Sequence, residues 1–330
     1  MKAKHILFAT ALALVSCKQG TQTVQTESQT AETTDKQAVW DTSYGGVDKA
    51  YDTELLAMRA EIAPKFQRLA FEDETTGRTM YYNLFTPKSD DENQKYPLVL
   101  FMADASTVGK SPQAPLMQGY GGIIWATDES QAENPSFVLV PEFAGPESAV
   151  NDKSQTTDEV GIALRLLEKI VSTHAIDRNR LYTTGQSMGG MISFYFNATH
   201  PDLFAASLFV GSQWDINVLK PLEKEKFFYI VSAGDERASA GMANLENLFK
   251  TDNIAFGQTQ FSAKLPQAEQ EAKIQQLINE GFERNFVKFD KNTVVPAGVS
   301  MQGAPEHMYS FDYAYKLQKV REWLFRQTKK

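Results

Sequence analysis

Two kinds of apolar pattern alternate along the chain from about residue 65 to the C-terminus. Short, nearly continuous apolar runs such as Pro97–Met102 and Phe137–Pro141 predict strands that are buried on both faces. Stretches with apolar residues three or four positions apart, such as 156–173, predict amphipathic helices. This alternation favours a parallel sheet whose strands are joined by helical crossovers.

The predicted elements follow one another along the whole of this region. The predicted strands are 65–72, 79–86, 97–102, 137–141, 180–184, 205–210, 226–232 and 285–289. The predicted helices are 51–63, 156–173, 244–249, 267–280 and 311–326, with a further helix that starts at Met188. We therefore expect an α/β fold with a mostly parallel central sheet flanked by helices, in one domain over residues 40–330.

The N-terminal pattern is different and predicts an export signal. Met1–His5 is basic, and the apolar run Ile6–Val15 is too short to cross a bilayer as a helix. Leu14-Val15-Ser16-Cys17 resembles a bacterial lipobox, which implies a lipoprotein signal peptide over residues 1–16 and a lipid on Cys17. An ordinary signal peptide with an incidental cysteine is the weaker alternative, because Cys17 is the only cysteine in the chain.

Residues 17–39 are predicted to tether the domain to a membrane. Positions 18–39 are rich in Thr, Gln, Ser and Glu and have too few large apolar residues for a core. Lys18, rather than Asp, after Cys17 favours the outer membrane, by resemblance to bacterial sorting rules. We expect an exported, membrane-anchored lipoprotein, in the outer membrane or facing the periplasm. Its net charge of −8 argues against a nucleic-acid partner.

The candidate chemistry begins at Gly185-Gln186-Ser187-Met188-Gly189, between a predicted strand and a predicted helix. This arrangement is typical of a nucleophile elbow. The serine occupies a strained turn, and flanking residues without a Cβ let strand and helix pass closely. The backbone N–H of Met188, at the helix start, would then point at a developing oxyanion. The motif predicts Ser187 as a nucleophile.

A nucleophilic serine needs a base, and the histidines narrow the choice. In this arrangement the acid and then the histidine follow the serine along the chain. His5 is removed with the signal peptide, His174 precedes Ser187, and His200 lies before the next strand. His307 remains, in a predicted loop between the last strand and the terminal helix. We therefore predict His307 as the base.

The orienting acid is expected after the strand 226–232. Asp235 follows that strand, where a buried carboxylate would hold the imidazole and stabilise the imidazolium. The adjacent Glu236 remains open as an alternative. Asp215, after the preceding strand, is a lesser candidate.

Further stretches extend the pattern well beyond the elbow: Tyr96–Phe101, Gln118–Gly121, Asp177–Tyr182, Pro201–Ala206 and Arg321–Phe325. With the elbow, they resemble the serine esterase branch of the α/β-hydrolase superfamily, near the polyhydroxybutyrate-depolymerase-like and prolyl-oligopeptidase-like esterases. The resemblance covers most of the chain from about Phe66 onward. It implies an α/β-hydrolase fold and an acyl-enzyme mechanism with Ser187, Asp235 and His307.

The loop after the strand 97–102 departs from that family. Many relatives carry His-Gly there, and a backbone N–H of the pair completes the oxyanion hole. This chain has Ala103-Asp104-Ala105-Ser106 instead. A carboxylate facing an oxyanion would oppose catalysis, so we expect Asp104 to turn away and cap the loop. The second donor is then the backbone N–H of either Asp104 or Ala105.

The sequence also predicts pocket residues and a reaction class. Candidate pocket residues near the predicted strand ends are Trp125, Trp214, Gln118 and Tyr309. The sequence has no His-Glu-x-x-His motif, paired cysteines or Asp-rich calcium loop, so no metal or cofactor is expected.

We predict a serine hydrolase, most simply a carboxylesterase, acting on a small-molecule ester or short acyl substrate. The alternatives are a serine peptidase of the prolyl-oligopeptidase type and a non-catalytic binding lipoprotein on the same fold.

Overall fold

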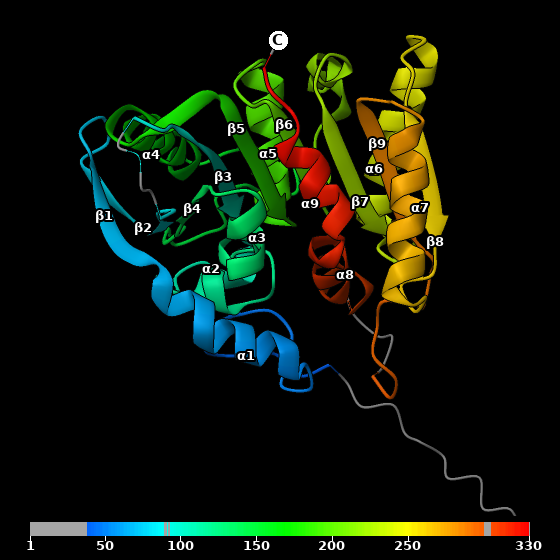
Figure 1. Ribbon diagram of the computed structural model, residues 1–330, viewed down its shortest axis with the longest axis horizontal. Coiled ribbons are helices and arrows are strands. Elements are labelled where there is room, and N and C mark those ends of the chain that lie inside the picture. Colours follow the sequence, from blue (N-terminus) through cyan, green and yellow to red (C-terminus); the bar gives the residue numbers. More distant parts are fainter. Residues whose placement is uncertain (1–37, 89–90, 92, 300–304, 330) are drawn as a thin grey trace, which may run out of the picture. The chain divides into compact units, whose positions relative to one another are not determined.

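The computed structural model describes residues 38–88, 91, 93–299 and 305–329, and within them the chain forms one nine-stranded sheet (Figure 1). The strands are β1 (Gln67–Asp73), β2 (Arg78–Phe85), β3 (Tyr96–Met102), β4 (Phe137–Pro141), β5 (Ile176–Gln186), β6 (Ala206–Val210), β7 (Phe227–Ser232), β8 (Gly257–Phe261) and β9 (Arg284–Phe289). The predicted signal peptide, Cys17 and the tether up to residue 37 lie outside the described residues.

The sheet is mostly parallel. Its strand order is β1-β2-β4-β3-β5-β6-β7-β9-β8. β2 pairs antiparallel with both β1 and β4, and all other neighbours are parallel. This confirms the predicted fold class.

Helices connect the strands and cover the sheet. They are α1 (Thr53–Ile62), α2 (Ala114–Met117), α3 (Asp128–Glu133), α4 (Asp158–Thr173), α5 (Met188–Thr199), α6 (Glu236–Thr251), α7 (Gln267–Asn279), α8 (Pro305–Lys316) and α9 (Gln318–Phe325). Within the described residues, none of the helices combines the length and apolar character that crossing a membrane would require.

The core has two halves, one on each face of the sheet. Because side chains alternate along a strand, Val99 and Phe101 of β3 join one apolar cluster while Leu98 and Leu100 join the other. The first cluster includes side chains of α1, α7, α8 and α9, and the second includes side chains of α4, α5 and α6. The central strands β3, β4, β6 and β7 are therefore buried at every position.

Several observed elements differ from the prediction, and three of these differences lie at the edge of the sheet or near the site. Strand β8 was not predicted, because it is an edge strand whose central residues 258–260 are polar and partly exposed. Helix α6 begins at Glu236 rather than 244. The predicted terminal helix 311–326 is two helices, α8 and α9, and α8 already begins at Pro305. His307 therefore lies in the first turn of a helix and not in a loop.

Candidate active site

The turn between β5 and α5 holds Ser187 in a strained conformation. Ser187 is the single residue between the two elements, with φ 50° and ψ −115°, a backbone region that residues with a side chain rarely adopt. Its N–H donates to the Val210 carbonyl at 3.0 Å, and its carbonyl accepts from the Met191 N–H at 2.9 Å. These bonds anchor the turn to β6 and α5, leaving the hydroxyl free to point away from the sheet.

The motif glycines are required by close packing around this turn. A Cβ on Gly185 would overlap the backbone of Gly189, and a Cβ on Gly189 would overlap the carbonyl of Met102. The first turn of α5 therefore passes directly against the end of β3. Only residues without a side chain allow this approach.

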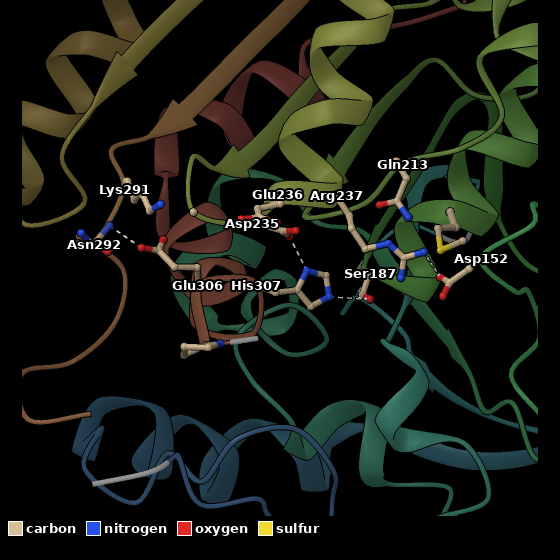
Figure 2. A pocket seen from close by; sticks show the side chains of 13 residues that line it. Asp152, Ser187, Gln213, Asp235, Glu236, Arg237, Lys291, Asn292, Glu306 and His307 are labelled. Carbon is tan, nitrogen blue, oxygen red and sulfur yellow. Dashed lines mark hydrogen bonds and ion pairs between the residues drawn. The ribbon is translucent and has the colours of Figure 1, made fainter. Parts of the chain in front are cut away.

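Ser187, His307 and Asp235 form a continuous hydrogen-bonded line (Figure 2). The Nε2 of His307 lies 2.8 Å from the Ser187 Oγ, and its Nδ1 lies 2.5 Å from the Asp235 Oδ2. The Asp235 side chain is 6% exposed and that of His307 is 23% exposed. A nucleophile, a base and a buried carboxylate that orients the base are thus brought together from the β5–α5 turn, α8 and the end of β7.

Secondary contacts fix the orientation of both partners of the serine. The Asp235 Oδ1 accepts from the Ala238 N–H at 3.2 Å, so the same carboxylate also caps α6. The imidazole of His307 meets the ring of Phe311 edge-on, with centroids 4.9 Å apart. The His307 ring is thereby held between the carboxylate and an aromatic side chain on its own helix.

The region of the predicted oxyanion hole lies at the start of α5 and in the loop after β3. The Met188 N–H belongs to the first helical turn, whose N–H groups have no partner within the helix. The Asp104 carboxylate is turned into its own loop, where it accepts from the Ser106 N–H at 2.7 Å and from the Gln186 Nε2 at 3.1 Å. The carboxylate does cap the loop, and the backbone N–H groups of Asp104 and Ala105 both remain candidates for the second donor.

Comparisons with known proteins bear on the fold. No family model matches the sequence, and no curated protein matches it. Solved structures do match. A thermostable esterase aligns with a TM-score of 0.61 and 22% identity over 81% of this chain, which spans 64% of that protein's length.

Two further structures match over most of their own length. The feruloyl esterase module from Clostridium thermocellum, in complex with sinapinate, has a TM-score of 0.51 at 14% identity and covers 88% of this chain and 96% of its own. A ferulic acid esterase from Anaeromyces mucronatus has a TM-score of 0.52 at 10% identity, covering 78% and 89%. The chain has the α/β-hydrolase fold.

A cavity of about 550 Å³ opens beside Ser187. It is lined by Asp152, Ser187, Met191, Gln213, Gly234, Asp235, Glu236, Arg237, Lys291, Asn292, Pro305, Glu306 and His307. Most of these residues are polar or charged. An ion pair of 2.8 Å joins Arg237 to Asp152.

Sequence reasoning missed most of this lining. Asp152, Gln213, Lys291 and Asn292 lie on connecting segments, where neither apolar period nor motif marks a residue. Only Arg237 and Glu306 could have been predicted to line the cavity, because they lie close to Asp235 and His307 in the sequence.

The predicted pocket residues lie elsewhere. Trp125 is fully buried in the core, where its Nε1 donates to the Gly121 carbonyl and its ring packs edge-on against Tyr315. Trp214 is also buried and packs against the ring of Tyr195. Neither Trp125 nor Trp214 is among the described residues that line the cavity at Ser187. Both predictions were wrong because these aromatic side chains, although near strand ends, pack against helices and do not face the cavity.

The other two are also outside the cavity. Tyr309 is buried, and its ring lies 6.3 Å from that of Tyr51, in a separate pocket of the same domain. Gln118 is buried too: its Oε1 accepts from the Gln186 Nε2 at 2.8 Å, and its Nε2 donates to the Ser106 Oγ at 2.7 Å. It therefore supports the loop after β3 rather than lining a substrate pocket.

The alternative residues have other contacts. Asp215 accepts from the backbone and side-chain nitrogens of Asn217, in the connection between β6 and β7. The His174 Nδ1–H donates to the Ile170 carbonyl at 3.1 Å, and the His200 Nδ1 lies 2.9 Å from the Thr199 hydroxyl. Glu236 lines the cavity, but the His307 Nδ1 is bonded to Asp235. Within the described part of the chain, no group of three or more His, Cys, Asp or Glu residues is placed to hold a metal ion.

Proposed function

We propose that this protein is a serine hydrolase that cleaves carboxylic esters of small molecules through an acyl-enzyme on Ser187. The observation that carries the proposal is the hydrogen-bonded line from Ser187 through His307 to Asp235, on a strained turn between strand and helix. Ester hydrolysis is further supported by the esterases among the structures with a similar fold.

The reaction has two halves. In the first, the His307 Nε2 takes the proton of the Ser187 hydroxyl while Oγ attacks the ester carbonyl. The N–H of Met188, with that of Asp104 or Ala105, would bind the oxyanion, and His307 then gives its proton to the leaving alcohol. In the second, His307 takes a proton from water, which attacks the acyl-enzyme, and then gives that proton to the Ser187 Oγ as the bond to the acyl group breaks and the acid is released.

The carboxylate of Asp235 contributes without taking the proton. It holds the Nδ1–H of His307, which leaves Nε2 as the acceptor facing Ser187. It also stabilises the imidazolium that forms in each half of the reaction. Its second oxygen caps α6, which keeps the carboxylate from rotating away.

The cavity favours short and polar substrates. Its volume of about 550 Å³ suits a small molecule. Charged groups such as Arg237 and Asp152 would be desolvated by a long apolar chain without gaining hydrogen bonds, which is unfavourable. We therefore infer that turnover is best with short acyl groups, or with acyl groups that carry polar substituents.

The first test is hydrolysis of p-nitrophenyl esters of increasing acyl length by the purified protein, beside Ser187→Ala and His307→Ala. We expect turnover of the short esters, and a fall of at least about 10⁴-fold in kcat for each variant. A fluorophosphonate should label the parent protein but not Ser187→Ala. Ester turnover that survives Ser187→Ala would contradict the proposal. Cleavage of prolyl anilides without ester cleavage would favour a peptidase, and binding without any turnover would favour a binding protein.

We also propose that the mature protein is anchored to a bacterial membrane through a lipid on Cys17. The support is the sequence of residues 1–17 and the polar composition of residues 18–39. Labelled palmitate should be incorporated by bacteria producing the full chain and not by the Cys17→Ser variant. Incorporation that is unchanged in Cys17→Ser would contradict the anchor.

A further inference from the structure

Glu306, the residue before His307, is a buried carboxylate that joins three elements of the domain. It is 4% exposed and lies in the first turn of α8. It accepts a hydrogen bond from the Ser232 hydroxyl at the end of β7. It accepts another from the backbone N–H of Asn292, after β9, which Figure 2 shows. One side chain thus ties the helix that carries His307 to two neighbouring strand ends.

The turn that carries Asp235 is shaped around the same carboxylate. The Gly234 N–H lies 3.4 Å from the Ser232 hydroxyl, and the Asp235 N–H donates to the Ser232 carbonyl at 3.0 Å. A Cβ on Gly234 would overlap the carboxyl carbon of Glu306. The backbone between Ser232 and Asp235 therefore lies directly against Glu306.

A purely structural role would not require a carboxylate at this place. No ion pair links Glu306 to a cation within the described residues. Burying an acid is unfavourable unless donors satisfy it, and an apolar side chain would fill the space at lower cost. Glu306 offers instead two acceptor oxygens at fixed separation, one for each neighbouring strand end.

We infer that Glu306 is a positioning residue that sets the distance between His307 and Asp235. The inference rests on the proposed function. Asp235 and His307 are 72 positions apart in sequence, and their 2.5 Å contact requires the end of β7 and the start of α8 to keep a constant separation. Glu306 bonds to the end of β7 and is part of the start of α8, and its hydrogen bonds go to Ser232 and Asn292 rather than to Ser187.

Two variants separate this role from simple burial. Glu306→Ala removes both acceptors, and we expect kcat for a short ester to fall about 10- to 100-fold while KM stays within about twofold, because a small misplacement of a base slows the chemical step. Glu306→Gln keeps an acceptor for Asn292 and can donate to the Ser232 hydroxyl, so it should retain kcat within about threefold.

A matched control lies at the opposite end of β7. Glu225 is also buried, at 6% exposure, and accepts from the backbone N–H of Asp202. Glu225→Ala should lower the thermal midpoint without changing kcat. A kcat in Glu306→Ala equal to that of the parent, or a loss of kcat in Glu225→Ala of the same size, would overturn the inference.

Proton NMR provides a readout that does not depend on turnover. The short bond between the His307 Nδ1 and the Asp235 Oδ2 should give a strongly downfield proton in the parent and in Glu306→Gln, lost or broadened in Glu306→Ala. A downfield proton that persists unchanged in Glu306→Ala would overturn the inference.

The same measurements remain usable if one variant or the proposed function fails. If Glu306→Ala does not fold, Ser232→Ala removes one of the two bonds and should lower kcat and weaken the resonance to a smaller extent. An unchanged kcat and resonance in Ser232→Ala would then overturn the inference. If the parent turns over no ester, the proposed function fails, while the resonance still tests the position of His307.

Discussion

At the scale of single residues, Asp235 has two tasks that depend on the two oxygens of one carboxylate. Oδ2 meets the His307 ring and Oδ1 caps α6. Asp235→Asn keeps the shape of the side chain and one acceptor oxygen. Its amide N–H₂ must then face either His307 or the Ala238 N–H, each of which needs an acceptor. If the amide nitrogen faces His307, the imidazole must turn its N–H toward Ser187 and loses its ability to accept a proton.

We therefore expect Asp235→Asn to lower kcat by about 10³- to 10⁴-fold with little change in thermal midpoint. The measurement is steady-state hydrolysis of a short p-nitrophenyl ester. Asp215→Asn is the matched control, because Asp215 was a lesser candidate for this acid from the sequence and its carboxylate accepts from Asn217 instead. Equal losses in both variants would show that the effect is not specific to the contact with His307.

Site residues that are identified by their order along the chain could be predicted. Residues whose position depends on how helices pack could not. Ser187, His307 and Asp235 follow from the elbow motif, the small number of histidines and the order of strands. Trp125 and Trp214 could not be placed, because a side chain near a strand end can face the cavity or the helical layer. That choice is made by the packing of α5 and α9, which no local pattern encodes.

At the scale of elements, the close passage of α5 over the end of β3 is the contact that shapes the site. Gly189 makes this passage possible, because a Cβ there would overlap the Met102 carbonyl. Gly189→Ala must push α5 away from β3, and with it the N–H of Met188 and the turn at Ser187. We expect it to lower the free energy of unfolding by about 2–4 kcal/mol and to abolish ester turnover.

Gly161→Ala is the control for this substitution. Gly161 lies inside α4, and the nearest atom to an added Cβ is the Arg165 Nη1 at 3.2 Å, the guanidinium nitrogen that does not bond to Asp73. Alanine is favoured over glycine in a helix by about 1 kcal/mol, so this variant should be neutral or stabilising. Denaturant unfolding of both variants tests the pair. A Gly189→Ala protein as stable and active as the parent would show that the β3–α5 contact is not tight.

Helix starts at the site were the least predictable elements. Residues 236–243 have no clear apolar period, so α6 was expected only from 244, and its true start depends on the cap from Asp235. Helix α8 was expected from 311, because Gly303-Ala304-Pro305 was interpreted as a loop. Proline is favoured at the first position of a helix, and α8 does begin at Pro305.

At the scale of the whole molecule, the parallel sheet brings the site residues together at the carboxyl ends of its strands. Parallel strands end on the same side, so the turns after β5 and β7 and the connection after β9 meet there. The alternation of apolar runs and helical stretches was sufficient to predict a mostly parallel sheet flanked by helices. The edge strand β8 was missed because its polar residues do not need the two-sided burial that marks the central strands.

The sheet also holds carboxylates that make stability depend on pH. Asp73 accepts two bonds from Arg165, which hold its pKa well below the usual range although burial opposes this. The contribution of Asp73 to the free energy of unfolding is complete above its unfolded-state pKa, near about 4, and is lost as the pH falls below that value. Glu142, at the end of β4, acts in the opposite direction. Burial raises its pKa to about 7, opposed by Arg68 and reinforced by the charge of Glu159.

A carboxyl group with a raised pKa stabilises the fold only while it is protonated. The contribution of Glu142 is therefore complete below its unfolded-state pKa, near about 4.5, and is lost as the pH rises through about 7. Glu142→Gln keeps a neutral side chain at every pH, so we expect it to raise the stability at pH 8 by on the order of 2 kcal/mol and to change it little at pH 4.5.

Thermal unfolding of parent and variant between pH 4.5 and 8 measures this difference, with Glu147→Gln, an exposed residue of the same loop, as control. A constant difference between parent and Glu142→Gln across the range would contradict the assignment. Because Asp73 is stabilising only above about pH 4 and Glu142 only below about pH 7, these two groups together favour maximal stability of the parent at mildly acidic pH. Glu142→Gln removes only the loss of stability above pH 7. The variant should therefore keep its maximal stability up to about pH 8, while its loss of stability below about pH 4, which depends on Asp73, is unchanged.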